Sequence, residues 1–196
     1  GENRETTIID GSNNIDPVII IEDLGVVNAI ISGFTIQNGT CTDGGSDGGG
    51  IFMRSSSLKL KDLIIRDNIA SHRGGGILIK NNSNPTLDNI LIENNTASLG
   101  GGIHIWDNSN PEIINSIIIN NISEDSGGGI YLSSSSATIN NSTISNNTAN
   151  NHGGGIYSGN NSSLTLTNSF VSDNFAVGGG GIDIEGTSVE HSQLSI

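Results

Sequence analysis

The sequence contains a single cysteine, Cys41, so no disulfide can form within the chain and the fold must hold without one. Basic residues are also scarce: there are 7 lysines and arginines against 20 aspartates and glutamates, which gives a net charge of −13. Because so acidic a chain repels the phosphate backbone, we expect no nucleic-acid partner. No apolar run approaches the roughly 18 residues of a membrane-spanning helix, so we expect no membrane insertion.

Prolines number only 3 and aromatic residues make up 4% of the chain, whereas glycine occurs 28 times. Gly-rich polar chains are often disordered, but isoleucine is plentiful here and regularly spaced, so there is enough apolar surface for a core. We expect one domain, residues 1–196, with less regular opening coils at 1–47 and regular repeats at 48–196. No signal-peptide pattern stands at the start, and we expect the chain to be a piece of a longer protein.

A glycine triplet followed by isoleucine marks the repeats and occurs six times. The isoleucines are 26, 26, 27, 26 and 26 residues apart, and a fixed period in this range is typical of a solenoid, in which one structural unit stacks on copies of itself. We expect the glycines to occupy a corner where positive φ or close backbone approach leaves no room for a Cβ. The triplets begin at Gly48, Gly74, Gly100, Gly127, Gly153 and Gly179.

Short segments in each repeat carry apolar residues at spacing two, which is the period of a β-strand. Turns rich in Gly, Asn, Ser and Asp separate these segments, and no stretch shows the helical period. The sequence therefore predicts an all-β fold, a parallel β-helix of about seven coils, with about 26 residues and three short strands in each coil. A coil here is one full turn of the chain around the solenoid.

Asparagine recurs at one position of each regular repeat, and a second polar row stands six residues before it. In a parallel stack each amide can donate to one neighbour and accept from the other, so both rows are predicted to form hydrogen-bonded ladders. Asn121 and Asn141 also stand in N-glycosylation sequons, but regular phasing in every coil favours the ladder. The first row is Asn68, Asn95, Asn121, Asn147 and Asn174, and the second is Asp62, Asn89, Asn115, Asn141 and Asn168.

The pairing of Gly-Gly-x-Ile with Ile-x-x-Asn, as at Ile92 to Asn95 and Ile118 to Asn121, resembles the repeat of chlamydial polymorphic outer-membrane proteins. It also resembles the broader group of secreted bacterial and archaeal right-handed β-helix proteins, and residues 31–39 are similar to the opening coils of pectate-lyase-like members. The resemblance implies a right-handed parallel β-helix, an extracellular or cell-surface location and, in some members, adhesion. It implies no catalytic residue.

Two rows of side chains on the strand after each triplet are expected to face outward, and they carry aromatic residues. An exposed aromatic stripe binds a ligand, such as a sugar, or is covered by another surface. Neither row offers clustered carboxylates next to a base, so catalysis is not expected; an enzyme of this kind would be a polysaccharide lyase or glycoside hydrolase. The candidate ligand-binding residues are Phe52, His104, Trp106, Tyr131 and Tyr157.

Oxygen donors in the loop at residues 43–47 make Asp43 and Asp47 a weak candidate site for Ca²⁺, although two carboxylates also fit an acidic, solvated loop. No other cofactor is expected. The four histidines show no metal-ligand spacing: they are His72, His104, His152 and His191. A third outward row is apolar and predicts lateral packing: it consists of Ile64, Leu91, Ile117, Thr143 and Phe170.

These features predict a structural or adhesive extracellular rod that associates with itself or with neighbouring coils of a longer chain. The alternative is a carbohydrate-binding or polysaccharide-cleaving module that uses the aromatic rows. Neither end of the sequence shows a capping segment over its terminal coil, and both ends carry apolar rows of the same phase. We therefore also expect that copies can stack head to tail into a fibre.

Overall fold

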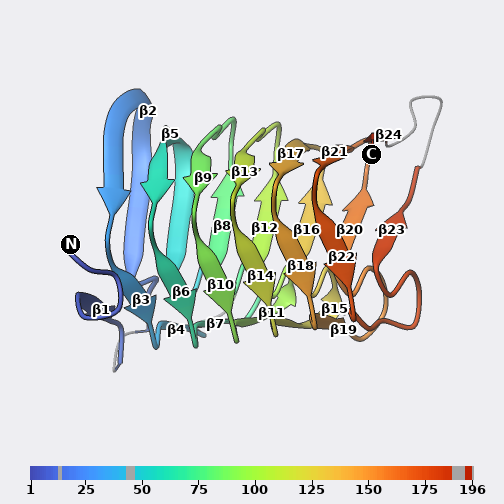
Figure 1. Ribbon diagram of the computed structural model, residues 1–196, viewed down its shortest axis with the longest axis horizontal. Helices are drawn as coiled ribbons and strands as arrows, with labels where there is room; N and C mark the ends of the chain where they lie inside the picture. Colours follow the sequence, from blue (N-terminus) through green and yellow to red (C-terminus); the bar gives the residue numbers. More distant parts are fainter. Residues whose placement is uncertain (13–14, 43–46, 187–192, 196) are drawn as a thin grey trace.

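The computed structural model describes residues 1–12, 15–42 and 47–186, together with the backbone of 193–195. These residues form 24 strands and no helix, wound as a parallel β-helix of about six turns. Figure 1 shows the coils side by side along the long axis of the molecule, with β1 (Ile8–Asp10) and β23 (Ile182–Ile184) at opposite ends. The described residues contain no helix that is long and apolar enough to span a membrane.

One face of the rod is a sheet of seven short parallel strands, one from each successive coil. Seven strands delimit six complete turns, which is why a count of rows in the sequence suggests about seven coils. After β1, the strands of this sheet are β3 (Thr35–Gln37), β6 (Ile64–Arg66), β10 (Leu91–Glu93), β14 (Ile117–Ile119), β18 (Thr143–Ser145) and β22 (Phe170–Ser172).

The largest sheet has 12 strands and covers two faces of the rod, because its long strands β2 (Ile19–Ser32) and β5 (Ile51–Lys61) contribute to both. Residues 51–54 of β5 belong to the face that follows the glycine triplets, and residues 59–61 belong to the next face. The first face continues through β8 (Ile77–Lys80), β12 (Ile103–Trp106), β16 (Ile130–Ser133), β20 (Ile156–Gly159) and β23. The second face continues through β9 (Thr86–Asp88), β13 (Glu112–Ile114), β17 (Ser136–Asn140), β21 (Ser163–Thr167) and β24 (Gln193–Ser195).

Five strands of two to five residues form a third sheet that the sequence pattern does not predict. Their inward residues are small, at Cys41, Ala70, Ala97, Ser123 and Ala149, so no large apolar residue marks these segments as strands. The strands are β4 (Thr40–Cys41), β7 (Ile69–Ala70), β11 (Thr96–Leu99), β15 (Ile122–Ser126) and β19 (Thr148–Ala149).

The core consists of apolar rows in which each side chain stacks on its counterpart one coil away, as the spacing predicts. Ile103 pairs with Ile77 on one side and Ile130 on the other, and all three are fully buried. Ile36 aligns with Ile65 in the opening coils, also as predicted. Burial of these apolar rows supplies the main driving force for folding.

The three glycines of each triplet serve two different purposes. The first has positive φ, for example 66° at Gly100, a conformation in which a Cβ is strained. In the first five triplets the second and third glycines lack room instead: a Cβ would lie 2.3 Å from the Ile122 carbonyl oxygen at Gly101, and 2.5 Å from the Gly129 carbonyl oxygen at Gly102. The triplet therefore allows neighbouring coils to approach closely at this corner.

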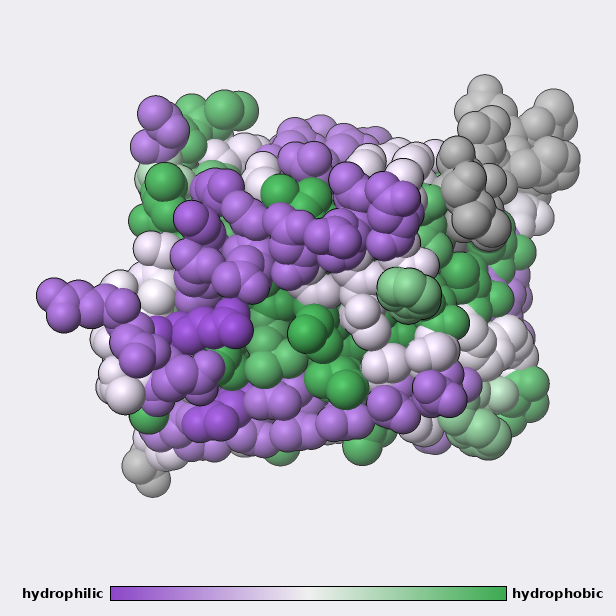
Figure 2. All heavy atoms as spheres, viewed as in Figure 1, coloured by the Kyte–Doolittle hydropathy of each residue, from purple (hydrophilic) through white to green (hydrophobic). Residues whose placement is uncertain are grey.

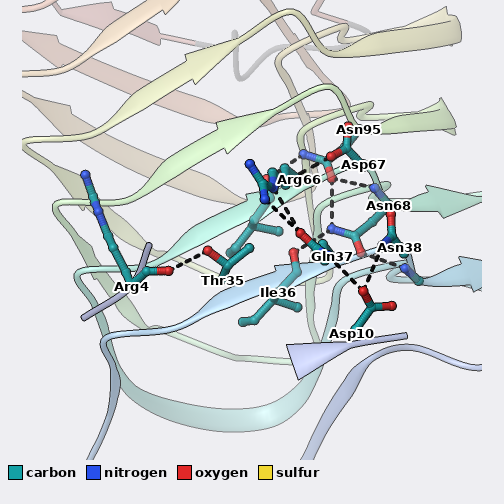
Figure 3. Close-up of polar contacts among 12 residues, drawn as sticks. Arg4, Asp10, Thr35, Ile36, Gln37, Asn38, Arg66, Asp67, Asn68 and Asn95 are labelled. Carbon is teal, nitrogen blue, oxygen red and sulfur yellow. Dashed lines mark hydrogen bonds and ion pairs between the residues drawn. The ribbon is translucent and has the colours of Figure 1, made fainter. Parts of the chain in front are cut away.

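The inner asparagine row forms a continuous ladder along the solenoid. The side-chain Nδ2 of Asn68 donates to Oδ1 of Asn95 at 3.0 Å (Figure 3), and the same contact repeats to Asn121, Asn147 and Asn174, each at 3.0 Å. The backbone N–H of each of the first four residues also donates to the next Oδ1. Asn121 has no exposed surface, so its sequon cannot carry a glycan in the folded protein.

The outer polar row does not form the continuous ladder that its phasing predicts. Asn141 donates to Asn115 and Asn89 to Asp62, but Asn115 donates to Asp88 instead of Asn89. The physical reason for this row is conformational: every member has φ between 50° and 55°, the left-handed region that Asn and Asp tolerate better than other non-glycine residues. The row is Asp62, Asn89, Asn115, Asn141 and Asn168.

Two serine rows, which the apolar spacing does not predict, satisfy further backbone groups. The N–H of Ser83 donates to Oγ of Ser109 at 3.1 Å, and the N–H of Ser116 donates to Oγ of Ser142 at 3.1 Å. Their spacing of 26 or 27 residues is the signal that identifies them in the sequence. The first row is Ser56, Ser83, Ser109, Ser135 and Ser162, and the second is Ser116, Ser142 and Ser169.

The third outward row of the sequence lies on the outer face of the seven-stranded sheet. Ile117 and Phe170 are 46% and 72% exposed, and Figure 2 shows hydrophobic atoms gathered in the middle of this face, with hydrophilic atoms above and below. Ile64 is buried instead, where the opening segment folds over the sheet and the Arg4 guanidinium donates to the Leu63 and Asn89 carbonyl oxygens. The apolar row is therefore exposed only away from the opening coils.

Candidate functional site

The face that follows the glycine triplets carries the two outward rows that the sequence predicts. Strand register places Phe52, Leu78, His104, Tyr131, Tyr157 and Asp183 in one line, each residue opposite the next. The second row is less continuous: Arg54 stands opposite Lys80, and Trp106 opposite Ser133. Parallel pairing therefore brings all five candidate ligand-binding residues onto one surface.

The aromatic rings of the first row lie against one another. The centroids of His104 and Tyr131 are 4.7 Å apart, and those of Tyr131 and Tyr157 are 4.8 Å apart with 22° between the ring planes. Such stacking contributes about 0.5–1.5 kcal/mol per pair beyond area burial. Because the ring faces point at each other along the rod, they are not available as a platform for a sugar ring.

Cationic side chains lie over the remaining two aromatic residues. The Arg73 guanidinium carbon lies 4.4 Å from the centroid of Trp106, and Lys80 Nζ lies 4.6 Å from that of Phe52. These are cation–π distances. The expectation of a fully exposed aromatic stripe is wrong for His104 and Tyr157, which are only 2% and 9% exposed, because neighbours in adjacent coils cover them.

Basic groups surround Asp47, one of the two calcium candidates. Lys80 Nζ, His72 Nδ1 and Arg73 Nη1 lie 3.5, 3.7 and 3.8 Å from its carboxylate oxygens. The positive charges of Lys80 and Arg73 at these distances repel a further cation, so this surrounding does not favour Ca²⁺. Asp43 lies outside the residues that the structure describes.

His104 is a buried histidine that remains neutral in the folded protein. Burial, reinforced by the positive charge of Arg73, lowers its pKa from 6.5 to about 3, and its Nδ1 lies 3.4 Å from the Leu99 carbonyl oxygen. The other basic groups that act on it are His72 and Lys80. Protonation of this ring therefore opposes folding.

We expect acid to destabilise the protein through His104. The unfolded histidine binds a proton below pH 6.5, while the folded one stays neutral down to about pH 3, so its contribution to stability is complete above pH 6.5 and is lost as the pH falls. The loss at pH 5 is about 2 kcal/mol. Urea unfolding at pH 7 and pH 5 would measure it. In H104L the difference between the two pH values should shrink by that amount; an unchanged difference would contradict the assignment.

A second polar cluster occurs at the other end of the same face, and the sequence analysis missed it. Nδ1 of His152 lies 2.9 Å from Oδ2 of Asp183 and 3.9 Å from Oε1 of Glu185. The hydroxyl of Tyr157 donates to Oε2 of Glu185 at 2.8 Å. The expectation that neither row holds clustered carboxylates beside a base is therefore wrong at this position.

The missed cluster is built across coils. Asp183 stands opposite Tyr157 in the strand register, and His152 forms a bridge with Gly178 at the preceding corner. The hydrogen bond with Asp183 raises the pKa of His152, and burial, together with the bond to Glu185, raises the pKa of Tyr157. His152 and Asp183 belong to adjacent coils and lie far apart in the sequence, so no short metal-binding motif reveals them. Alignment of the repeats places them in neighbouring positions.

A family model described as a right-handed β-helix region matches residues 18–194 of the chain. The match includes the strand β2 of the opening coils and the regular repeats up to residue 194. The comparisons with curated proteins and with solved structures gave no match.

Proposed function

Because the chain belongs to the right-handed β-helix family, we propose that it is a structural rod of the cell surface or extracellular space that associates with further copies of itself through the ends of its solenoid. The fold supplies what such a rod needs. Its core and its asparagine ladder run continuously along the axis, and they require no disulfide, since Cys41 is the only cysteine and is buried.

The observation that carries the proposal is the open edge of β2. Among the described residues, β2 pairs with β5 on one side and with no strand on the other. Four large apolar side chains along it are exposed: Ile20 at 54%, Leu24 at 52%, Val26 at 88% and Ile30 at 59%. An unpaired edge with exposed apolar residues is a template for another strand.

The opposite end of the rod also has an edge strand that is unpaired on one side among the described residues. β23 pairs with β20 and with no other described strand. Phe170, Phe175 and Val177 of the last regular coil are 72%, 65% and 84% exposed. The two ends of the rod are different surfaces, so a contact between one end of one copy and the opposite end of the next is heterologous. Such a contact leads to a linear assembly instead of a closed dimer.

Sedimentation and negative-stain microscopy of the isolated chain test the proposal. We expect the mass to rise with concentration and elongated particles to appear. The double variant V26K/I30K places charges on the open edge and should remain monomeric, because charged edge residues block strand addition. The matched control is I117K, which changes a 46%-exposed isoleucine on the side of the rod and should still assemble. A parent chain that stays monomeric at every concentration would overturn the proposal.

A further inference from the structure

We propose that His152, Asp183 and Glu185 form a binding site for a divalent transition-metal ion, with Zn²⁺ as the best fit. One ligand atom from each of these side chains lies within 4.8 Å of the other two. Asp183 lies on β23, the edge strand at the far end of the rod, in the row of outward-facing side chains of that face. The site would join the coil that contains β20 to the coil that contains β23.

The distances suit a small metal ion. Zinc binds histidine nitrogen and carboxylate oxygen at about 2.0–2.2 Å, so ligand atoms around a tetrahedral zinc lie roughly 3.3 Å apart. His152 Nδ1 lies 2.9 Å from Asp183 Oδ2 and 3.9 Å from Glu185 Oε1, which brackets that value. Small side-chain shifts would therefore complete the geometry, and the fourth position would remain open to water.

Gly178 provides space for these ligand atoms. A Cβ at this position would lie 2.7 Å from Nδ1 of His152 and 3.2 Å from Oδ2 of Asp183. Its φ does not lie in the left-handed region, so the backbone conformation does not require glycine there. The same corner position carries a side chain in the earlier coils, at Asp47, Arg73, Leu99, Ser126 and His152. The absence of a side chain at Gly178 is therefore best explained by the cluster that it accommodates.

Outer contacts orient the ligands in the way that metal sites require. The Tyr157 hydroxyl donates to Oε2 of Glu185, and Oε1 of the same carboxylate lies 3.9 Å from Nδ1 of His152. Hydrogen bonds of this kind hold ligating carboxylates in position and are typical of metal sites. His152 and Glu185 are 46% and 48% exposed in their side chains, so an ion can reach the cluster from solvent.

The ligand types decide which metal fits. Imidazole nitrogen suits zinc, nickel and copper, whereas Ca²⁺ and Mg²⁺ prefer oxygen ligands alone. Two carboxylates and a neutral imidazole carry a formal charge of −2, which a divalent cation neutralises. The site therefore differs in chemistry from the calcium site considered at Asp43 and Asp47.

Calorimetric titration of the chain with ZnCl₂ tests the proposal. We expect saturable binding of one ion per chain and an increase in melting temperature, with no comparable effect of CaCl₂. Affinity should fall at least tenfold in H152A and in D183N. It should fall similarly in G178A, which keeps all three ligands but fills the space between them.

The matched control is H72A, which removes a histidine of similar exposure beside Asp47 and should bind Zn²⁺ within twofold of the parent. Circular dichroism would show that each variant is folded. Absence of saturable Zn²⁺ binding in the folded parent chain would overturn the proposal. So would an affinity that is unchanged in H152A, because the ion would then be bound elsewhere.

Discussion

Replacing Ile130 by aspartate is expected to lower the free energy of unfolding by about 5 kcal/mol. The side chain is fully buried, and its row neighbours Ile103 and Ile156 are apolar and fully buried as well. A carboxylate at this position has neither water nor a counter-ion. It must either stay protonated, at a high cost in free energy, or cause the central coils to unfold. Urea unfolding followed by circular dichroism would measure the loss.

The matched control for this variant is I117D. Ile117 lies on β14 and is 46% exposed, so the same substitution there should cost about 1 kcal/mol or less. Equal losses in the two variants would mean that the inward and outward faces have been assigned wrongly. A melting temperature of I130D within a degree or two of the parent would mean the same.

Replacing Asn121 by leucine is expected to lower the free energy of unfolding by about 3–5 kcal/mol, because several buried polar groups lose their partners together. Its Oδ1 accepts hydrogen bonds from the backbone N–H and the Nδ2 of Asn95, each at 3.0 Å. Its Nδ2 donates to Oδ1 of Asn147 and to the carbonyl oxygen of Ile92, each at 3.0 Å. None of these groups can form a replacement hydrogen bond with water, because the row is buried.

An exposed asparagine provides the comparison for Asn121. The side chain of Asn150 donates one hydrogen bond, to the Glu124 carbonyl oxygen, and the residue is exposed to solvent. N150L should therefore change the free energy of unfolding by about 0.5 kcal/mol or less. If N121L and N150L unfold at the same urea concentration, the ladder contributes nothing to stability and its phasing needs another explanation.

The fold could be predicted because its rules are local and repeated. Spacing two within a segment identifies the inward side chain, and the repeat period identifies its neighbour in the next coil. The stacking of Ile77, Ile103 and Ile130 follows from these two numbers alone. The short third sheet escaped prediction because its inward residues are alanine, serine and cysteine, which are small and give no pattern of large apolar side chains.

The candidate site could be predicted only in part, because exposure depends on neighbours in other coils. The sequence places His104 on the outer face, but it cannot show that its neighbours in adjacent coils cover the ring. The sequence also cannot distinguish an asparagine that forms a hydrogen-bonded ladder, such as Asn121, from one that adopts positive φ, such as Asn115. The two roles produce the same periodic row.

Pulsed electron paramagnetic resonance on spin labels four coils apart tests the parallel, in-register stacking most directly. Ile69 and Phe175 are 44% and 65% exposed, and the pairing of Ile69, Thr96, Ile122, Thr148 and Phe175 places them on one line along the rod. With Cys41 replaced by serine, labels at I69C and F175C should give one narrow distance distribution. Four steps of about 4.8 Å predict a backbone separation of roughly 19 Å, to which the label arms add a few ångströms. A broad distribution, or one centred beyond about 30 Å, would contradict the stacking of these coils.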